Sequence, residues 1–208
     1  NVFLKGGNKF NAFMLNKKEL DDKGWVLVDE KVRTIIKKIK QQKYTSLSNI
    51  CNSYQGIITG CDKAFVLNKD TSLRKNIEND IIKPWIKSSY IEKNKILRKD
   101  SYIIYSDLIC NPKEYSNAIA YIGLQREKLL KRRECQKGIR KWYELQWGRN
   151  QSIFEGEKIV FPFKASSNRF ALDTGSYFSA DVYALTLKED AAVTYDFLLY
   201  ILNSKIYE

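Results

Sequence analysis

The period of apolar positions changes along the chain, and each period predicts a different kind of element. Apolar residues recur every third or fourth position over Asp29–Gln42, Pro112–Leu130 and Asp190–Asn203, which is the spacing of an amphipathic helix. A shorter helix is predicted over Ser72–Ile81, and it ends before Pro84 because the residue before a proline avoids helical angles. The residues expected to face inward from the helix after Pro112 are Tyr115, Ile119, Ile122, Leu129 and Leu130.

Short apolar runs rich in β-branched and aromatic residues predict strands between these helices. The runs are Trp25–Val28, Ala64–Leu67, Ser101–Tyr105, Lys158–Phe161, Arg169–Leu172 and Val182–Leu187. Helices and strands follow one another irregularly, and we find no internal repeat. The pattern therefore predicts an α+β fold in which mixed sheet elements combine with several helices.

A polar loop framed by Gly56 and Gly60 runs directly into the apolar run that starts at Ala64. Glycine has no Cβ, so the backbone here can adopt positive φ angles and approach a ligand closely. The polar side chains at this glycine turn are Gln55, Thr59, Asp62 and Lys63. Because a rigid turn with hydrogen-bonding side chains is suited to recognition, we predict that these four side chains contact a ligand.

Composition narrows the class of protein. The 208 residues are 44% hydrophobic, which is enough for a sizeable core. The chain has no histidine, and its four cysteines form no Cys-x-x-Cys pair, which excludes histidine-based catalysis and argues against a zinc site. The longest apolar run, Phe197–Leu202, is too short to span a bilayer, and the first residues lack the apolar core of a signal peptide. We therefore expect a cytoplasmic protein with reduced thiols and no membrane partner.

Positive charge is in excess and concentrated in one stretch. Lys and Arg number 36 against 24 Asp and Glu, a net charge of +12, which favours nucleic acid as the partner but also fits an anionic membrane or a solubilising surface. Residues 126–149 hold nine basic and three acidic side chains, half of the excess. Trp142, Tyr143 and Trp147 lie among them and either stack on bases or pack in the core, of which we favour the core. The residues predicted to contact phosphates are Arg126, Lys131, Arg132, Arg133, Lys137, Arg140, Lys141, Arg149 and Lys164.

A second polar loop lies between two predicted strands and ends in Ser167, Asn168 and Arg169. Asn pairs bidentately with adenine edges in the major groove, and Arg pairs with guanine edges. Loops between strands are commonly polar, so this segment is either a solvated connection or a second base-contacting loop. We predict base contacts from these three side chains together with the four at the glycine turn.

Catalytic patterns are incomplete in this chain. Glu155, Glu157 and Lys158 supply the residue types of a magnesium-dependent nuclease, but in the wrong register. The segment Asn-Pro-Lys-Glu-Tyr at 111–115 departs from the Asn-Pro-Pro-Tyr motif of adenine methyltransferases, and no phosphate-binding glycine loop is present. We expect no catalytic residue and no metal site here. The alternatives are a nuclease built on these three residues and a subunit-docking module with a basic surface.

Seven short motifs, taken in order, resemble the C-terminal specificity domain of TaqI-like adenine-N6 DNA methyltransferases, including fused type IIG restriction-modification enzymes. The first is the glycine turn, Gly-Ile-Ile-Thr-Gly-Cys-Asp-Lys-Ala-Phe-Val at 56–66. The others are Ile-Lys-Pro from 82, Tyr-Ile-Ile-Tyr from 102, Leu-Lys-Arg-Arg from 130, Trp-Tyr-Glu-Leu from 142, Lys-Ile-Val-Phe-Pro from 158 and Leu-Leu-Tyr-Ile-Leu-Asn-Ser from 198. Each motif alone is weak, but their shared order over residues 47–204 is specific.

The resemblance implies that residues 46–208 form a target-recognition domain, truncated at its C-terminus, that binds double-stranded DNA and selects the site. Residues 1–45 would be the tail of an upstream methyltransferase domain and a connecting helix. That upstream domain of the parent protein would bind S-adenosylmethionine and methylate an adenine flipped out of the duplex. The fragment itself would need no cofactor.

Overall fold

The computed structural model describes residues 2–6, 9–15, 17, 20, 25–68, 70–71, 76–97 and 100–207. The chain divides into two compact units, Asn1–Ser46 and Leu47–Glu208. Among the described residues, no helix is both long enough and apolar enough to cross a membrane.

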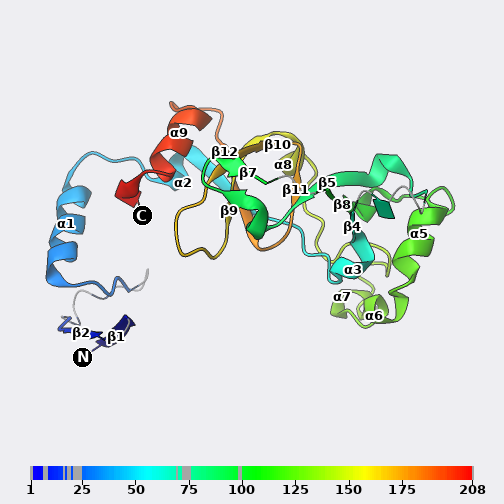
Figure 1. The fold of residues 1–208 in the computed structure, drawn as a ribbon, viewed down its shortest axis with the longest axis horizontal. Helices are drawn as coiled ribbons and strands as arrows, with labels where there is room; N and C mark the ends of the chain where they lie inside the picture. The colour runs from blue at the N-terminus through cyan, green and yellow to red at the C-terminus, as the bar shows by residue number, and fades with distance from the viewer. Residues whose placement is uncertain are drawn as a thin grey trace. The chain divides into compact units, whose positions relative to one another are not determined.

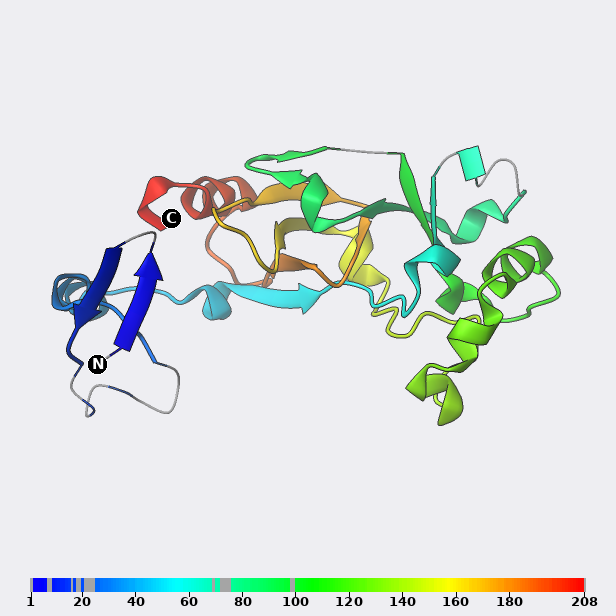
Figure 2. The same ribbon diagram turned by 60° about the horizontal axis from the view of Figure 1, so that its bottom comes forward.

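The described residues of the first unit include a two-stranded hairpin and the helix α1. β1 (Val2–Gly6) pairs antiparallel with β2 (Lys9–Phe13) (Figure 2). α1 (Glu30–Gln41) begins where the Asp29 carboxylate accepts a hydrogen bond from a backbone amide three residues on at 2.9 Å, which caps the helix. The helical prediction is confirmed. The strand predicted over Trp25–Val28 is wrong, because the backbone there is irregular and pairs with none of the described strands.

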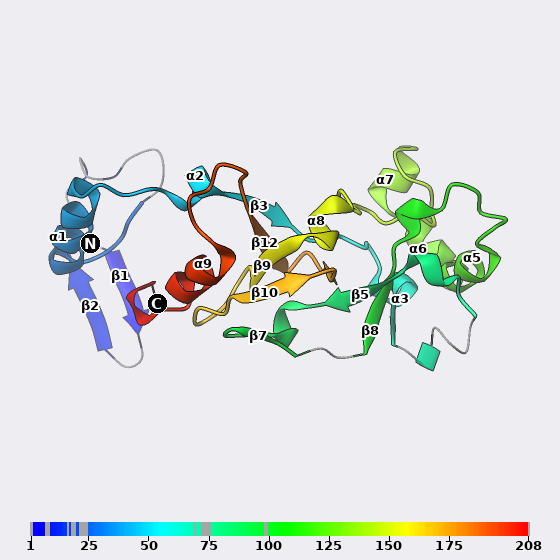
Figure 3. The same ribbon diagram turned by 90° about the horizontal axis from the view of Figure 1, so that it is seen from above.

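The second unit contains two four-stranded sheets. The first sheet has the strand order β10-β9-β12-β3 and is antiparallel throughout (Figure 3). Its strands are β3 (Cys51–Gln55), β9 (Glu157–Pro162), β10 (Ala171–Thr174) and β12 (Val182–Leu187). A single helical turn, α2 (Leu47–Ile50), leads into β3. The strands predicted over 158–161 and 182–187 are confirmed.

Helix α9 (Tyr195–Leu202) covers one face of the first sheet. The buried residues of this contact are Cys51, Ile159, Leu185 and Leu198. Val160, the next residue along β9, faces the larger core instead, as the two-residue period of a strand requires. The Thr194 hydroxyl caps α9 by accepting from the amide three residues on at 3.2 Å. The helix therefore begins later than the predicted Asp190, and it is followed by the short η5 (Lys205–Tyr207).

The second sheet has the strand order β11-β5-β8-β4, in which only β11 and β5 are parallel. Its strands are β4 (Val66–Asn68), β5 (Ile82–Ile86), β8 (Ser101–Ile104) and β11 (Tyr177–Phe178). A short hairpin of β6 (Ile91–Glu92) and β7 (Lys95–Ile96) lies beside β10. Trp85 and Ile103 of the second sheet belong to the same buried core as Val160 of the first. The two sheets therefore share one core.

Short helices gather at the end of the second unit beyond the second sheet (Figure 1). They are α3 (Asp62–Phe65), α5 (Ser116–Gly123), α6 (Arg126–Leu130) and α7 (Arg133–Gln136), while α8 (Ser152–Glu155) precedes β9. The 3-10 turns are η2 (Asn79–Ile81), η3 (Ser88–Tyr90) and η4 (Ser106–Leu108). The single long helix predicted after Pro112 is wrong, because a turn at Leu124–Gln125 separates α5 from α6. Leu129 is buried as expected, but Leu130 is 46% exposed, since the turn changes the phase of the apolar stripe.

Three other predicted boundaries also differ from the structure. Ala64 and Phe65 belong to α3, and the strand begins at Val66, because a short apolar run suits a buried helical turn as well as a strand. Of the helix predicted over 72–81, residues 72–75 lie outside the described residues, Asn76 has a φ of 49° and only 79–81 are helical, as a 3-10 turn. The strand predicted from Arg169 begins at 171. The predicted α+β class is confirmed.

Candidate nucleic-acid interface

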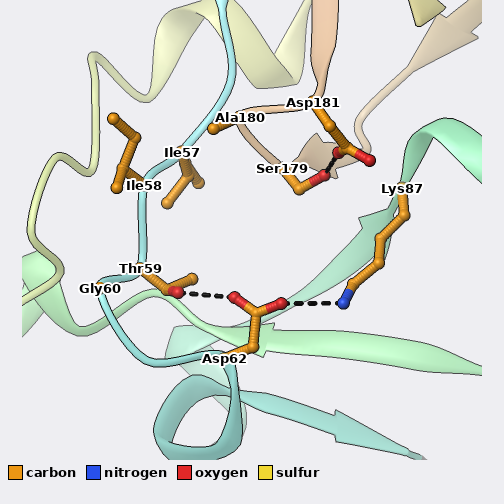
Figure 4. A pocket seen from close by; sticks show the side chains of 9 residues that line it. All are labelled: Ile57, Ile58, Thr59, Gly60, Asp62, Lys87, Ser179, Ala180 and Asp181. Carbon is orange, nitrogen blue, oxygen red and sulfur yellow. Dashed lines mark hydrogen bonds and ion pairs between the residues drawn. The ribbon is translucent and has the colours of Figure 1, made fainter. Parts of the chain in front are cut away.

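A polar cleft of about 250 Å³ opens where the glycine turn meets the end of β5 and the turn before β12 (Figure 4). The polar residues of its lining are Thr59, Asp62, Lys87, Ser179 and Asp181. The first two come from the predicted recognition turn. The sequence patterns did not indicate the other three, because they lie in segments that carry no glycine turn or charge run.

One wall of the cleft carries three side chains linked in series. The Thr59 hydroxyl donates to Asp62 Oδ1 at 2.6 Å, and Lys87 Nζ donates to Asp62 Oδ2 at 2.8 Å (Figure 4). The Lys87 side chain remains 35% exposed. The glycine turn thus fixes the position of an ammonium group that comes from a different segment.

Asp181 forms the opposite wall. Its carboxylate accepts hydrogen bonds from the hydroxyls of Ser88 and Ser179, and the Ser88 amide lies 3.4 Å from Oδ2. The cleft therefore presents one ammonium group and two carboxylates, each held by neighbouring side chains.

Hydrogen bonding keeps the Lys87–Asp62 pair charged. The hydrogen bond to Asp62 raises the pKa of the Lys87 ammonium above its ordinary 10.5, although burial opposes it. Burial raises the pKa of Asp62, but the hydrogen bonds from Lys87 and Thr59 outweigh it, so that pKa lies below 3.8. Both groups are therefore ionised at neutral pH.

The two glycines of the turn serve different purposes. Gly60 has a φ of 74°, which confirms the predicted left-handed position. Gly56 is required by close approach: a Cβ there would lie 2.2 Å from the Ser179 carbonyl oxygen and 2.4 Å from that of Phe178. The turn therefore packs directly against the backbone before β12.

Residues 126–149, the basic segment, contact the glycine turn through the buried side chain of Arg132. This residue is 8% exposed, and its Nη1 donates to the Thr59 carbonyl at 3.2 Å. Its Nη2 donates to the carbonyls of Trp142 and Glu144, each at 2.9 Å. Because backbone acceptors enclose the guanidinium, the structure gives Arg132 a position in the frame of the domain, and its phosphate contact stays a prediction. Arg132 joins the glycine turn to the basic segment.

Two further contacts tie the basic segment to the turn. Ile58 and Trp147 exchange backbone hydrogen bonds at 3.1 and 2.9 Å. Arg149 donates from Nε to the Gly56 carbonyl at 3.1 Å and from Nη2 to Gln55 Oε1 at 2.9 Å. Gln55 in turn donates to the Ala180 carbonyl at 3.3 Å. The predicted contact residues Gln55 and Arg149 thus bind each other at the edge of the cleft.

The other predicted phosphate contacts are mostly exposed side chains. Those that face solvent are Arg126, Lys131, Arg133, Lys137, Lys141 and Lys164. Arg140 differs, because it is half-buried and its Nη1 lies 3.3 Å from a carboxylate oxygen of Asp107. Lys63, predicted at the glycine turn, is also exposed. Six of the predicted phosphate contacts therefore have side chains exposed to solvent, although Lys141 also lies 4.0 Å from Glu144.

The aromatic residues of the basic segment divide between core and surface. Tyr143 is buried, as the favoured interpretation predicts. Trp142 is half-buried, with the Arg126 guanidinium 5.1 Å from its ring centroid, and Trp147 is 39% exposed. The core prediction thus holds for Tyr143 but not for Trp147, whose ring lies at the surface with the Arg140 guanidinium 6.0 Å from its centroid.

Comparison with known proteins places this fold. Residues 83–208 match the family model of the TaqI-like C-terminal specificity domain. The chain belongs to this family. It is 26% identical over 178 residues to the type II methyltransferase M.BanIII of Aneurinibacillus aneurinilyticus, and the match covers 80% of this chain and 31% of that protein. The fold is similar to that of the type IIL restriction-modification enzyme MmeI, solved in complex with DNA, with a TM-score of 0.57, 12% identity, and coverage of 78% of this chain and 22% of MmeI.

The specificity domain thus spans less than a third of the relatives that it matches. The family model begins at Lys83, so it includes Lys87 and Asp181 but not the glycine turn.

The second predicted loop of the specificity domain does not line this cleft. The Asn168 amide donates to the carbonyls of Leu202 and Tyr207 at 3.2 and 2.8 Å, and Arg169 Nη1 donates to the Ile91 carbonyl at 3.2 Å. Ser167 is exposed. The structure therefore gives Asn168 and Arg169 positions in the frame of the domain, and their base contacts stay a prediction.

The alternative nuclease site is also occupied by internal contacts. Lys158 is fully buried, with Nζ 2.9 Å from Asp173 Oδ2 and 2.6 Å from the Phe154 carbonyl. Glu155 accepts a hydrogen bond from Gln151 at 2.7 Å, and Glu157 is exposed. Within the described part of the chain, no three Cys, Asp or Glu side chains are grouped so that they could hold a metal ion. Lys158 belongs to the core of the specificity domain.

Proposed function

We propose that this chain is the DNA sequence-recognition domain of a site-specific adenine-N6 DNA methyltransferase or fused restriction-modification enzyme. It would hold duplex DNA so that an upstream catalytic domain can flip and methylate an adenine. The family supports this function, as do a relative named as a methyltransferase and a fold shared with an enzyme solved on DNA. The observation that carries it is the cleft with its Lys87–Asp62 ion pair, whose turn is hydrogen-bonded by Arg132 to a segment rich in exposed cations.

Each part of this surface has chemistry suited to DNA. Base edges in the major groove offer donors and acceptors, and the cleft supplies an ammonium group and two carboxylates at fixed positions. The exposed cations of the basic segment suit phosphates. Because Arg132 binds the glycine turn to that segment, phosphate contacts on one side would fix the position of the cleft over the bases.

The parent protein would supply the cofactor site and the catalytic residues. We place the S-adenosylmethionine site and the catalytic residues in a methyltransferase domain upstream, and assign residues 1–45 to its tail and connecting helix. The 208-residue chain would then bind DNA without cofactor and without chemistry of its own, in the cytoplasm.

Salt dependence of duplex binding tests the phosphate contacts. If about five exposed cations of the basic segment release counterions, the logarithm of the association constant should fall with the logarithm of salt concentration at a slope of about −4 to −5. Fluorescence anisotropy with a labelled duplex measures this slope. A slope near zero would contradict the proposal, and magnesium-dependent cleavage of the duplex by the same chain would establish the nuclease alternative.

A further inference from the structure

We propose that Lys87 reads a guanine of the target site through its O6 and N7 atoms, and that Asp62 and Thr59 position the Lys87 ammonium group for this contact. The inference rests on the proposed DNA-recognition function and adds a specificity-determining residue and the base that it selects.

A hydrogen bond to Asp62 holds the Lys87 ammonium group in position. One of its three N–H groups donates to Asp62 Oδ2 at 2.8 Å, and Asp62 is itself fixed by the Thr59 hydroxyl at 2.6 Å (Figure 4). Two N–H groups remain, on a side chain that is 35% exposed and lines the cleft. An ammonium restrained in this way loses less freedom on binding than a lysine on an open surface.

Guanine matches these two donors better than any other base. In the major groove it presents two adjacent acceptors, N7 and O6, whereas adenine presents an acceptor beside a donor, thymine a single acceptor and cytosine a donor. Of the four bases, guanine alone presents two adjacent acceptors to two N–H groups on one nitrogen.

The charge of the cleft argues against a phosphate at Lys87. Asp62 and Asp181 both line the same cleft, so an entering phosphate would meet two carboxylates for one ammonium group. A base edge carries no net charge and avoids this repulsion. The basic segment, with nine basic and three acidic side chains, offers phosphates a net positive surface instead.

The test begins with the sequence preference of the 208-residue chain. Selection from a random duplex library defines the bound site, and competition with every single base-pair substitution gives the discrimination at each position. Lys87→Met should lose about tenfold discrimination at one G·C pair while the other positions keep theirs. Lys87→Arg, which also offers paired donors, should keep the guanine preference.

Two further variants separate positioning from loss of charge. Asp62→Asn should weaken discrimination at the same G·C pair and at no other. Lys95→Met removes the same charge from the exposed β6–β7 hairpin and should leave discrimination unchanged at every position. If Lys87→Met does not fold, as judged by its circular dichroism, the Lys87→Arg and Asp62→Asn variants provide the test.

Each outcome distinguishes the two proposals. Equal loss of affinity for all duplexes in Lys87→Met would assign Lys87 to a phosphate and overturn the inference, and an unchanged profile would overturn it as well. Both results leave the DNA-recognition function standing. A wild-type chain that binds every duplex equally, or none, would overturn the proposed function and this inference with it.

Discussion

Replacing Asp173 with alanine should destabilise the second unit more than any surface substitution, because it removes the anion that neutralises a buried lysine. Lys158 Nζ lies 2.9 Å from Asp173 Oδ2, and both side chains have no exposed surface. Breaking one partner of such a pair typically costs about 3–5 kcal/mol. That is a large part of the roughly 5–15 kcal/mol that stabilises a domain of this kind.

Urea unfolding followed by tryptophan fluorescence measures the loss. The matched control is Lys141→Ala, which removes a cation 4.0 Å from Glu144 in a pair whose lysine is 61% exposed. Such a surface pair contributes little to stability, because solvent screens it. The double variant Lys158→Met with Asp173→Leu should be more stable than Asp173→Ala alone, since it leaves no uncompensated charge in the core. An Asp173→Ala loss no larger than that of the control would refute this reasoning.

Three further predictions concern the frame and the cleft. Arg132→Lys should cost about 2–4 kcal/mol in urea unfolding, because one ammonium cannot replace a guanidinium fork on several carbonyls. Gly56→Ala should cost about 2–4 kcal/mol by the same measurement, since its Cβ would overlap the Ser179 carbonyl, whereas the same change at exposed Gly156 should be nearly neutral. The stability difference between wild type and Asp62→Asn should be present above pH 3.8 and disappear as the pH falls through the lower pKa of the folded state.

The sequence predicted the fold class and most strands, and its failures have identifiable physical causes. Val182–Leu187 was predicted correctly because it is a short run of mostly apolar residues, including β-branched Val182 and aromatic Tyr183, with polar residues on both sides. The helix after Pro112 was predicted as one piece because apolar spacing alone does not register a turn. Arg169 was assigned to a strand, but the adjoining backbone is held by Asn203, whose amide accepts from the Phe170 amide at 3.1 Å and donates to its carbonyl at 2.8 Å. No local pattern predicts a contact between residues so far apart.

The sequence indicated some of the residues that line the candidate site and missed others. Gly60, Thr59 and Asp62 were found because they lie in one short turn. Lys87 and Asp181 were missed because tertiary packing alone brings them to that turn. Charge counting placed Arg132 among the exposed cations, whereas its side chain is buried. Net charge does not distinguish an enclosed guanidinium from an exposed one.

The contacts that hold the glycine turn have a consequence for how such a domain changes its target. Arg132 binds the Thr59 carbonyl, Ile58 pairs with Trp147 through main-chain atoms, and Gly56 packs against main-chain oxygens. None of these contacts uses the side chains of Asp62 or Lys87. Under the proposed function, residues at the mouth of the cleft could therefore be exchanged while these scaffold contacts remain, which would make this turn a suitable place to evolve or redesign a new sequence preference.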